Sequence, residues 1–571
     1  MYFHIFSTAF RLHFLPMSRR CLRSPRPFFP TPMRPICYVL ALLMCIAPAF
    51  AKGQNVSTPD AGTSRLAEPS DPASTWCERA LMPAQLQYRA EASTAEATGP
   101  ILSLSMSGGG YRAMLFHVGT LRRLNDAGLL PRLSVISSVS GGSVTAAYLA
   151  YRWPDLRFNE FDQAINFTEV IEAPLRDLAG TTLDIPSIVS GVLPFSSSAR
   201  EQVDQFDKRL FGNALLADIA PGKFADDPNV RPRPVFILNS TSLQTGELWQ
   251  FRSSAMGGPI AHWTNPGKTH LAEAVAASSG FPPFLSPMTL DLRPVPAADW
   301  HDCGDFRDSP YGINNRNEPG RVPADGEVIA AFHQRVMLTD GGVRDNLGLG
   351  SLEEITRLRR LRGTARRTIT LISDGGASTA LDPNPSTNWL GQSLRVLHLM
   401  SDQPDEVRVA EVVRGNSIRL RRYGWSATDR DGCSTEPIPA QLEAARKQAA
   451  EDDTFDAYAY WSIRRRPKFH LGFDCPTDPD RWMLEEVRQL SSVPTAFRAM
   501  PSSLQARLVN WGYLAAQHGL PYIDYAWPDR QIRERWLNSC SLPYGAAVTD
   551  PDGDTASARD ARCLPLSEPK G

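Results

Sequence analysis

The residue whose surroundings best fit a nucleophile is a serine in a short, glycine-rich turn. In Ser138-Val139-Ser140-Gly141-Gly142, small residues stand two positions before and two positions after Ser140. A sharp strand-to-helix turn requires such residues because the two backbones crowd there. The turn presents the hydroxyl at a helix N-terminus, where the positive dipole favours developing negative charge. We therefore predict that Ser140 is a catalytic nucleophile. The alternative is that the serines only form a polar turn.

A run of glycines could supply the hydrogen-bond donors that such a nucleophile needs. Gly108, Gly109 and Gly110 follow the apolar run 101–106 and precede apolar residues at helical spacing. Successive backbone amides at a helix start stabilise the oxyanion of a tetrahedral intermediate. These three glycines are therefore the predicted oxyanion hole. Arg112, just inside the same helix, is a candidate for binding a phosphate or carboxylate head group, and the alternative is an ordinary surface arginine.

The same glycines also satisfy a dinucleotide-binding fingerprint. Residues 108–113 fit the pattern G-x-G-x-x-A after a strand. In that interpretation the next strand should end in an acidic residue that binds ribose. The next apolar run instead ends in Ser137 and Ser138. We therefore favour the oxyanion interpretation and predict no cofactor.

The expected catalytic partner of the serine is Asp340, which directly follows the apolar run 335–339. A carboxylate in water is too weak a base, so the site would have to bury it and raise its pKa. Asp374 begins a second Asp-Gly-Gly and is the alternative base, although a strand-end turn explains it more simply. A triad in the chain order Ser, Asp, His would nominate His398, His470 or His518.

The order of apolar runs and helical patterns predicts the elements that hold these residues. Short apolar runs alternate with helical patterns from residue 100 onward, which is typical of parallel strands joined by crossover helices. The expected strands are 101–106, 133–137, 235–239, 335–339, 368–373 and 458–463, and the clearest later helices are 389–414 and 504–518. Several candidate residues then lie at strand C-terminal ends, where open α/β sheets bind ligands.

Taken together and in this order, the glycine loop, the serine turn and Asp340-Gly341-Gly342 resemble the patatin-like phospholipase family, in its bacterial, exported form. Residues 234–251 resemble a strand pair of that family, and residues 276–284 resemble its helix followed by a proline loop. The resemblance covers roughly residues 98–350 and is weaker up to about 520. It implies a three-layer α/β/α fold with a mainly parallel sheet and additional C-terminal helices. It also implies a Ser/Asp dyad that hydrolyses lipid esters, with the roles given above for Ser140, Asp340 and the three glycines.

The expected activity is that of a lipid acyl hydrolase, of phospholipase A or lysophospholipase type, acting through an acyl-enzyme. The substrate would be a phospholipid or another lipid ester at a membrane surface, and apolar residues 185–195 and 281–285 could form the rim of the site. Ser138 stands where the family usually has glycine. The alternative is therefore a catalytically inactive lipid-binding or envelope interaction protein with the same fold.

Composition and charge exclude several other classes of protein. Sixty Lys and Arg residues nearly balance 61 Asp and Glu residues, so there is no net field for a polyanion, and nucleic acid is not an expected partner. No CxxC or HExxH spacing indicates a metal site. Residues 98–525 are the expected catalytic domain, preceded by a linker and N-terminal extension at 52–97 and followed by a polar tail at 526–571.

The first 51 residues are typical of an export signal. Basic residues precede the apolar run 36–50, which ends in Ala49-Phe50-Ala51. The alternative is a retained membrane anchor. Either way, we expect a periplasmic, cell-envelope or secreted protein.

Without a leader that ends at Ala51, six cysteines remain, and an even number in an exported chain indicates disulfides. The expected pairs are Cys433 with Cys475 and Cys540 with Cys563, and Cys303 is interpreted as a disulfide cysteine rather than a zinc ligand.

Overall fold

The computed structural model describes the chain from residue 72 to residue 544, with gaps. The main described ranges are 72–81, 100–183, 195–221, 231–281, 287–303, 326–361, 367–377, 405–412, 456–465 and 483–520. The predicted leader, most of the linker, the apolar segment 185–194 and the cysteines at 433, 475, 540 and 563 lie outside these residues.

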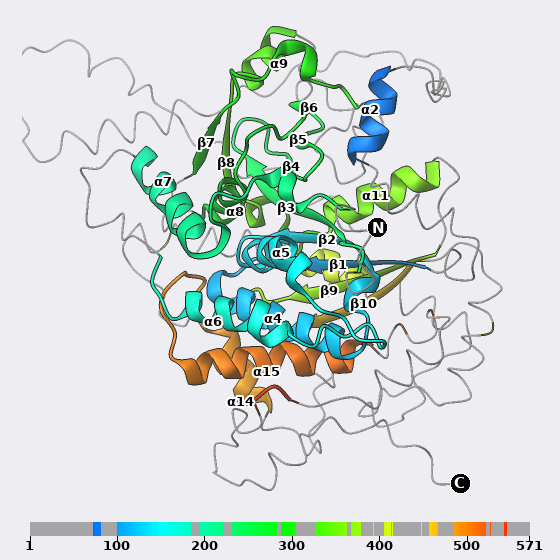
Figure 1. Ribbon diagram of the computed structural model, residues 1–571, viewed down its shortest axis with the longest axis vertical. Helices are drawn as coiled ribbons and strands as arrows, with labels where there is room; N and C mark the ends of the chain where they lie inside the picture. Colours follow the sequence, from blue (N-terminus) through cyan, green and yellow to red (C-terminus); the bar gives the residue numbers. More distant parts are fainter. Residues whose placement is uncertain are drawn as a thin grey trace, which may run out of the picture. The chain divides into compact units, whose positions relative to one another are not determined.

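Five parallel strands form one side of a ten-stranded sheet in the order β10-β9-β1-β2-β3 (Figure 1). Their bounds are Asp456–Ser462, Thr368–Asp374, Ile101–Met106, Leu133–Val139 and Val235–Ser242, respectively. Each begins within two residues of its predicted start. Strands this apolar are expected where both faces of a sheet are covered, because no side chain then faces water.

Helices cover both faces of this sheet, and the alternation of side chains along each strand shows the two layers. On β9, Ile369 and Leu371 belong to the large core beneath α4 (Gly110–Asp126), α5 (Gly141–Arg152) and α15 (Ser502–Gly519). Ile372 points to the opposite face and packs with Val409 of the helical residues 405–412. On that second face α11 (Gly350–Leu361) packs on β2 and β3. The predicted three-layer α/β class is confirmed.

Antiparallel strands extend the sheet beyond β3. The path continues through β4 (Leu248–Phe251), β5 (Met256–Gly258) and β6 (His262–Thr264). Separately, β8 (Arg335–Asp340) pairs with β3 and with β7 (Met288–Asp291). The other described helices are α6 (Ala173–Ala179), α7 (Phe195–Phe206), α8 (Leu271–Ser279), α9 (Gly326–Phe332), α10 (Gly342–Asp345) and α14 (Met483–Ser491).

The register of three strands brings two distant parts of the chain together. Both β2 and β4 pair with Leu238 and Asn239 of β3, so they occupy opposite edges of that strand. Both β4 and β8 pair with Ser240 and Thr241. β8 therefore pairs with the same edge of β3 as β2, starting where the pairing with β2 ends. The end of β2 at Val139 therefore meets the end of β8 at Asp340 head to head. β8 is antiparallel to β3, so Asp340 reaches the site from a strand that runs against the five parallel strands.

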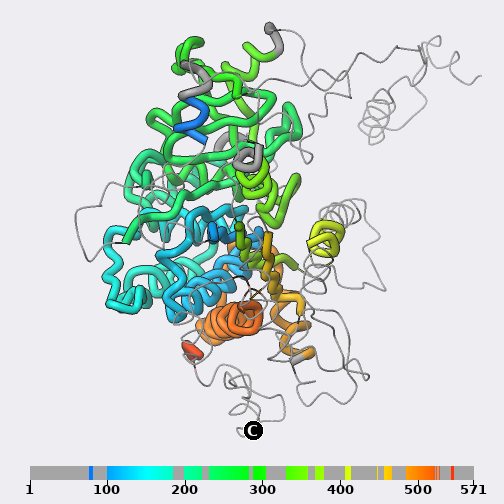
Figure 2. Tube along the Cα trace, turned by 90° about the vertical axis from the view of Figure 1, so that its right-hand side faces the viewer, coloured from blue at the N-terminus to red at the C-terminus, as the bar shows by residue number. Residues whose placement is uncertain are grey.

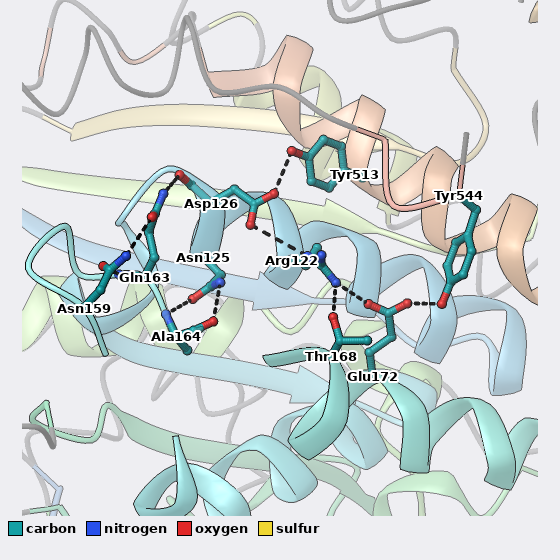
Figure 3. Close-up of polar contacts among 10 residues, drawn as sticks. All are labelled: Arg122, Asn125, Asp126, Asn159, Gln163, Ala164, Thr168, Glu172, Tyr513 and Tyr544. Carbon is teal, nitrogen blue, oxygen red and sulfur yellow. Dashed lines mark hydrogen bonds and ion pairs between the residues drawn. The ribbon is translucent and has the colours of Figure 1, made fainter. Parts of the chain in front are cut away.

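The C-terminal helix is part of the core. Figures 1 and 2 both place α15, in orange, against α4, in blue to cyan, and the two helices share buried residues such as Leu121 and Leu508. Tyr513 of α15 donates a hydrogen bond to Asp126 at the end of α4 (2.8 Å, Figure 3). The predicted helix at 504–518 is thus confirmed with slightly wider bounds.

Part of the predicted polar tail is also docked on this domain. The Tyr544 amide donates to Asn510 of α15 (3.0 Å), and the Tyr544 hydroxyl bonds to the buried Glu172, which also accepts from Arg122 of α4 (2.9 Å, Figure 3). The Arg176 guanidinium lies 4.3 Å from the centre of the Tyr544 ring. Residues 542–544 therefore do not belong to a free tail, because buried partners hold them.

The short helix α2 (Pro72–Leu81) is stapled to the antiparallel part of the sheet. In Figure 2 its blue segment lies among the green segments that follow residue 231. A disulfide joins Cys77 to Cys303, which confirms the interpretation of Cys303. Arg252 donates to the Leu81 carbonyl (2.6 Å), and Trp76 stacks on His301 with the ring centres 4.0 Å apart.

Removing this disulfide is expected to destabilise the domain. The bond closes a loop with a sequence separation of 226 residues, and closing long loops stabilises a fold by about 2–5 kcal/mol. We expect the double variant Cys77→Ser/Cys303→Ser to melt several degrees below the wild type without reductant, as measured by circular dichroism. Because this double variant changes only the two bonded cysteines, a difference in melting comes from this disulfide and not from another cysteine. Identical melting curves for the two proteins would show that the disulfide does not contribute to the stability of the domain.

Two properties of the described residues bear on the expected partners. None of the described helices is long and apolar enough to cross a membrane. Within the same residues, His, Cys, Asp and Glu side chains form no group that could hold a metal ion.

Candidate active site

Ser140 lies at a sharp turn between β2 and α5. Its backbone has φ 52° and ψ −121°, and a positive φ is unfavourable for a residue with a Cβ atom. The carbonyl of Ser140 accepts the amides of Ser143 (2.8 Å) and Val144 (3.1 Å), so the helix starts directly at the serine. The predicted strand, turn and helix are therefore present, and Ser140 stands at the helix N-terminus, where it is 3% exposed.

The N-termini of α4 and α5 meet at this turn, and glycine is required for them to approach. A Cβ atom on Gly141 would collide with the Gly110 carbonyl, and one on Gly142 would lie 2.6 Å from the Met106 carbonyl oxygen. A Cβ atom on Gly108 would lie 3.0 Å from that of Ser140. Because both helix dipoles begin here, negative charge that develops beside Ser140 is stabilised from two sides.

The amides of the glycine loop are not equivalent. The Gly108 N–H donates to the Asn346 carbonyl (3.1 Å), so it is already used inside the protein. Among the described residues, no acceptor is found for the amides of Gly109, Gly110 or Gly141. The sequence prediction of Gly108–Gly110 as three donors is therefore narrowed to Gly109 and Gly110. Gly141, the residue after the serine, is a further donor that the sequence analysis did not include.

Asp340 lies at the end of β8, and its carboxyl group is near enough to the Ser140 hydroxyl for that hydroxyl to lower its pKa. The Gly342 amide donates to its Oδ1 (2.7 Å), and the side chain is 4% exposed. Burial raises the pKa of Asp340 to about 6, although hydrogen bonds from Gly342 and Ser140 oppose the rise. Burial and a raised pKa are the properties expected of a carboxyl group that acts as a base.

Ser138 shows how the turn accommodates a side chain where the family usually has glycine. Its hydroxyl is fully buried, donates to the Ile237 carbonyl (3.2 Å) and lies 3.1 Å from the Ser143 hydroxyl. The extra oxygen therefore has partners and does not displace the turn.

Arg112 does not have the role predicted for it. The side chain is fully buried, so it is neither a head-group ligand nor a surface arginine. Its guanidinium donates to the carbonyls of Gly375 (2.9 Å) and Val493 and to the Thr495 hydroxyl (3.1 Å). A buried guanidinium must satisfy its donors inside the protein, and here it joins the glycine loop to two later segments.

The dinucleotide interpretation of the glycine loop also disagrees with the structure. The Tyr111 amide donates to the Ala496 carbonyl (3.0 Å), and a Cβ atom on Gly110 would lie 2.5 Å from that oxygen. The Tyr111 amide, which a pyrophosphate at this helix N-terminus would need, is therefore already used inside the protein.

Asp374, the alternative base, ends β9 and is saturated with donors. It accepts from the Tyr460 hydroxyl (2.7 Å), the Ser462 hydroxyl (3.0 Å) and the Arg464 guanidinium (2.7 Å). Burial acts to raise its pKa, but Arg464 and these hydrogen bonds outweigh burial and hold the pKa well below the usual range. Such a carboxylate is a poor proton acceptor, which supports its interpretation as a strand-end structure.

The described histidines do not form a triad with the serine. His117 is fully buried between the Ser373 hydroxyl and the Ser107 carbonyl, each 2.9 Å from one ring nitrogen. Burial lowers its pKa to about 4. His518 lies in the last turn of α15, and His398 and His470 lie outside the described residues.

Two residues that the sequence analysis did not select for the site lie next to it. Ser278, at the end of α8, accepts the Ser140 amide through its hydroxyl oxygen (3.0 Å). The Asn346 carbonyl accepts the Gly108 amide. The only signal in the sequence was their position inside segments that resemble the family.

The sequence of the region that holds this site matches a known family. Residues 104–352 match the family model described as patatin-like phospholipase, and this range contains Ser140, Asp340 and the glycine loop. The region is therefore similar to patatin-like phospholipase domains. No curated protein matches the chain.

Solved structures that the chain matches include human GIVD cytosolic phospholipase A2 with methyl gamma-linolenyl fluorophosphonate and terbium chloride (TM-score 0.37, 14% identity, 81% of this chain and 64% of that one). Another is VipD from Legionella pneumophila (TM-score 0.21, 14% identity, 69% and 67%). A third is ExoU from Pseudomonas aeruginosa in complex with SpcU (TM-score 0.17, 14% identity, 81% and 84%). The chain spans about 64% of the length of the human enzyme.

Proposed function

We propose that this protein is a lipid acyl hydrolase that cleaves carboxylic esters of phospholipids, lysophospholipids or related lipids with Ser140 and Asp340. The observation that carries the proposal is that Ser140, at a strained turn where two helix N-termini meet, lies at the end of β2 that faces the buried Asp340 at the end of β8. The family match over residues 104–352 supports the choice of lipid esters as substrates.

In the first half of the reaction, the Ser140 oxygen attacks the acyl carbonyl carbon while Asp340 accepts the hydroxyl proton. The carbonyl oxygen becomes an oxyanion, and the amides of Gly109, Gly110 and Gly141 are placed to stabilise it. The intermediate collapses by breaking the bond to the alkoxy group, which leaves as an alcohol with the proton that Asp340 carried. The acyl group remains on Ser140.

In the second half, a water molecule attacks the acyl-enzyme. Asp340 accepts a proton from this water, and the same amides hold the second oxyanion. When the intermediate collapses, the bond to Ser140 breaks, the proton returns to the serine oxygen, and a fatty acid is released. Asp340 therefore acts as base and then as acid in each half, and the mechanism needs no histidine.

A survey of lipid products separates this proposal from an inactive lipid-binding protein. The full chain is incubated with mixed phospholipid and glyceride vesicles, and products are identified by mass spectrometry beside Ser140→Ala. Fatty acids released only by the wild type support the hydrolase and identify the substrate class. A fluorophosphonate probe gives a second readout, because only an activated serine is labelled. Folded protein with neither activity nor label at Ser140 would instead favour the binder.

The pH dependence of the reaction should report the protonation of Asp340. Burial, opposed by hydrogen bonds from Gly342 and Ser140, raises its pKa to about 6, and only the ionised form can accept the serine proton. We expect kcat/KM to fall about tenfold per pH unit below this value and to be level above it. Assays at pH 8 after incubation at pH 5 control for acid unfolding. A profile that is flat from pH 5 to pH 8 would contradict Asp340 as base.

We also propose that the protein is exported, with residues 1–51 as a cleaved signal or a retained anchor and residues 98–525 as the catalytic domain. The disulfide between Cys77 and Cys303 supports this location, because such bonds persist mainly in oxidising compartments.

A further inference from the structure

The hydroxyl group of Ser278 is hydrogen-bonded to the backbone amide of Ser140. Ser278 is fully buried at the C-terminal end of α8. Its oxygen lies 3.0 Å from the Ser140 amide nitrogen, 2.6 Å from the Asn239 carbonyl oxygen and 2.8 Å from the Ser143 hydroxyl. Three segments of the site, the middle of β3, the serine turn and α5, therefore converge on one side-chain oxygen.

The chemistry of these partners fixes the direction of each hydrogen bond. A carbonyl oxygen can only accept, so the single Ser278 proton is donated to Asn239. The Ser278 oxygen then accepts from both the Ser140 amide and the Ser143 hydroxyl. All of these groups are buried, so the loss of the Ser278 oxygen would leave an amide and a carbonyl without their partners.

The same short segment also holds the backbone of the aspartate. The Ser278 carbonyl accepts the Gly341 amide (3.2 Å), and the Gly280 carbonyl accepts the Asp340 amide (3.1 Å) and the Thr339 hydroxyl (2.7 Å). Residues 278–280 thus bind the backbone of the nucleophile turn on one side and the end of β8 on the other. These two chain segments are 200 residues apart in the sequence.

The hydrogen bond between the Ser140 amide and Ser278 acts on a strained part of the backbone. A residue with a Cβ atom at φ 52° and ψ −121° is strained and persists only when its surroundings hold it. The hydrogen bond from the Ser140 amide to Ser278 acts on this peptide directly. Rotation of the peptide would carry the serine oxygen away from Asp340.

We propose that Ser278 is a positioning residue for the reaction, which holds the Ser140 backbone at the angle that keeps the serine oxygen on Asp340. This inference rests on the proposed function and adds a residue to it. Ser278 takes no part in proton transfer, and it acts on the chemistry only through the geometry of Ser140.

The neighbouring serine provides a matched control. Ser279 is on the same helix and is also buried, but its hydroxyl has no hydrogen-bond partner among the described residues. Ser278→Ala and Ser279→Ala therefore remove the same atom from adjacent buried positions, and only the first removes contacts with the site.

The test compares hydrolysis of a short-chain p-nitrophenyl ester by the wild type, Ser278→Ala, Ser279→Ala and Ser278→Cys. Misplacing a reacting atom by about 1 Å costs up to about 100-fold in rate. We expect Ser278→Ala to lower kcat by about 10- to 100-fold with KM within about twofold, and Ser279→Ala to stay within about twofold in both. Ser278→Cys keeps a weak donor and acceptor in the same place and should fall between wild type and Ser278→Ala.

A merely structural role gives a different result. In that case Ser278→Ala would lose thermal stability but keep its kcat per folded molecule, and this outcome overturns the inference. Should Ser278→Ala not fold, Ser278→Cys decides, since a kcat within twofold of wild type overturns the inference equally. If the wild type itself neither hydrolyses esters nor labels at Ser140, the proposed function fails, and the inference fails with it. If the wild type is fully active and Ser278→Ala has the same kcat, the positioning role of Ser278 is wrong while the proposed function stands.

Discussion

Replacing Ser140 by alanine is expected to lower kcat/KM for ester hydrolysis by at least about 10⁴-fold, because the covalent route disappears with the nucleophile. The Asp340 carboxylate and the free amides of the glycine loop would remain, but no described hydroxyl takes the place of the lost oxygen at Asp340. The measurement is release of fatty acid from vesicles, with fluorophosphonate labelling as a second readout. Both should vanish together.

The strained backbone at Ser140 supplies a control for folding. Alanine keeps the Cβ atom and hence the strain at φ 52°, whereas glycine adopts a positive φ freely. Ser140→Gly should therefore melt above Ser140→Ala, while both are inactive. If Ser140→Ala retained more than about 1% of the wild-type kcat/KM, another residue would have to be the nucleophile.

Much of this site could be predicted from the sequence because its main features are local. The turn at Ser140 follows from small residues between an apolar run and a helical pattern, and the helix start at Gly110 follows from three glycines. Both depend on backbone crowding within a few residues, which residue types reveal directly. Asp340 was found for a similar reason, since it ends an apolar run before two glycines.

What the sequence could not supply is the direction and pairing of distant strands. The apolar run 335–339 reads equally well as a parallel or an antiparallel strand, because its side-chain pattern is the same in both. Only the pairing of β8 with Ser240–Ser242 on the edge left by β2 explains why Asp340 meets Ser140. The residue types around Asp340 do not contain this pairing, which depends on strands far apart in the sequence.

The surroundings of Arg112 and Ser278 could not be predicted from the sequence for a related reason. Arg112 is one turn from the glycine loop, and nothing local reveals that Gly375, Val493 and Thr495 would surround its guanidinium. Ser278 lies in the small-residue run 276–280, where its hydroxyl looked like one of several interchangeable serines. Burial and partners separate Ser278 from Ser279, and both depend on tertiary contacts.

Replacing Asp340 by asparagine is expected to abolish most activity and to stabilise the fold at the same time. Asparagine keeps an oxygen for the Gly342 amide, which donates to Oδ1 of Asp340 (2.7 Å), but it cannot accept the serine proton. Loss of the general base should lower kcat/KM by about 10³-fold. The gain in stability follows from the pKa of Asp340, which burial raises from its ordinary value of 3.8 to about 6.

The sign of that stability change distinguishes the variant from an ordinary disruptive one. A carboxyl group whose folded pKa lies above its unfolded pKa favours the folded state while it is protonated, so the wild type loses stability as pH rises from about 3.8 through about 6. At 1.36 kcal/mol per pKa unit, the loss is about 3 kcal/mol at pH 8. Asp340→Asn does not titrate, so it should be more stable than the wild type at pH 8, and this advantage should shrink towards pH 4. Chemical denaturation at the two pH values measures it. An inactive variant that is also less stable at pH 8 would mean that Asp340 holds the fold together rather than serving as a base at the expense of stability.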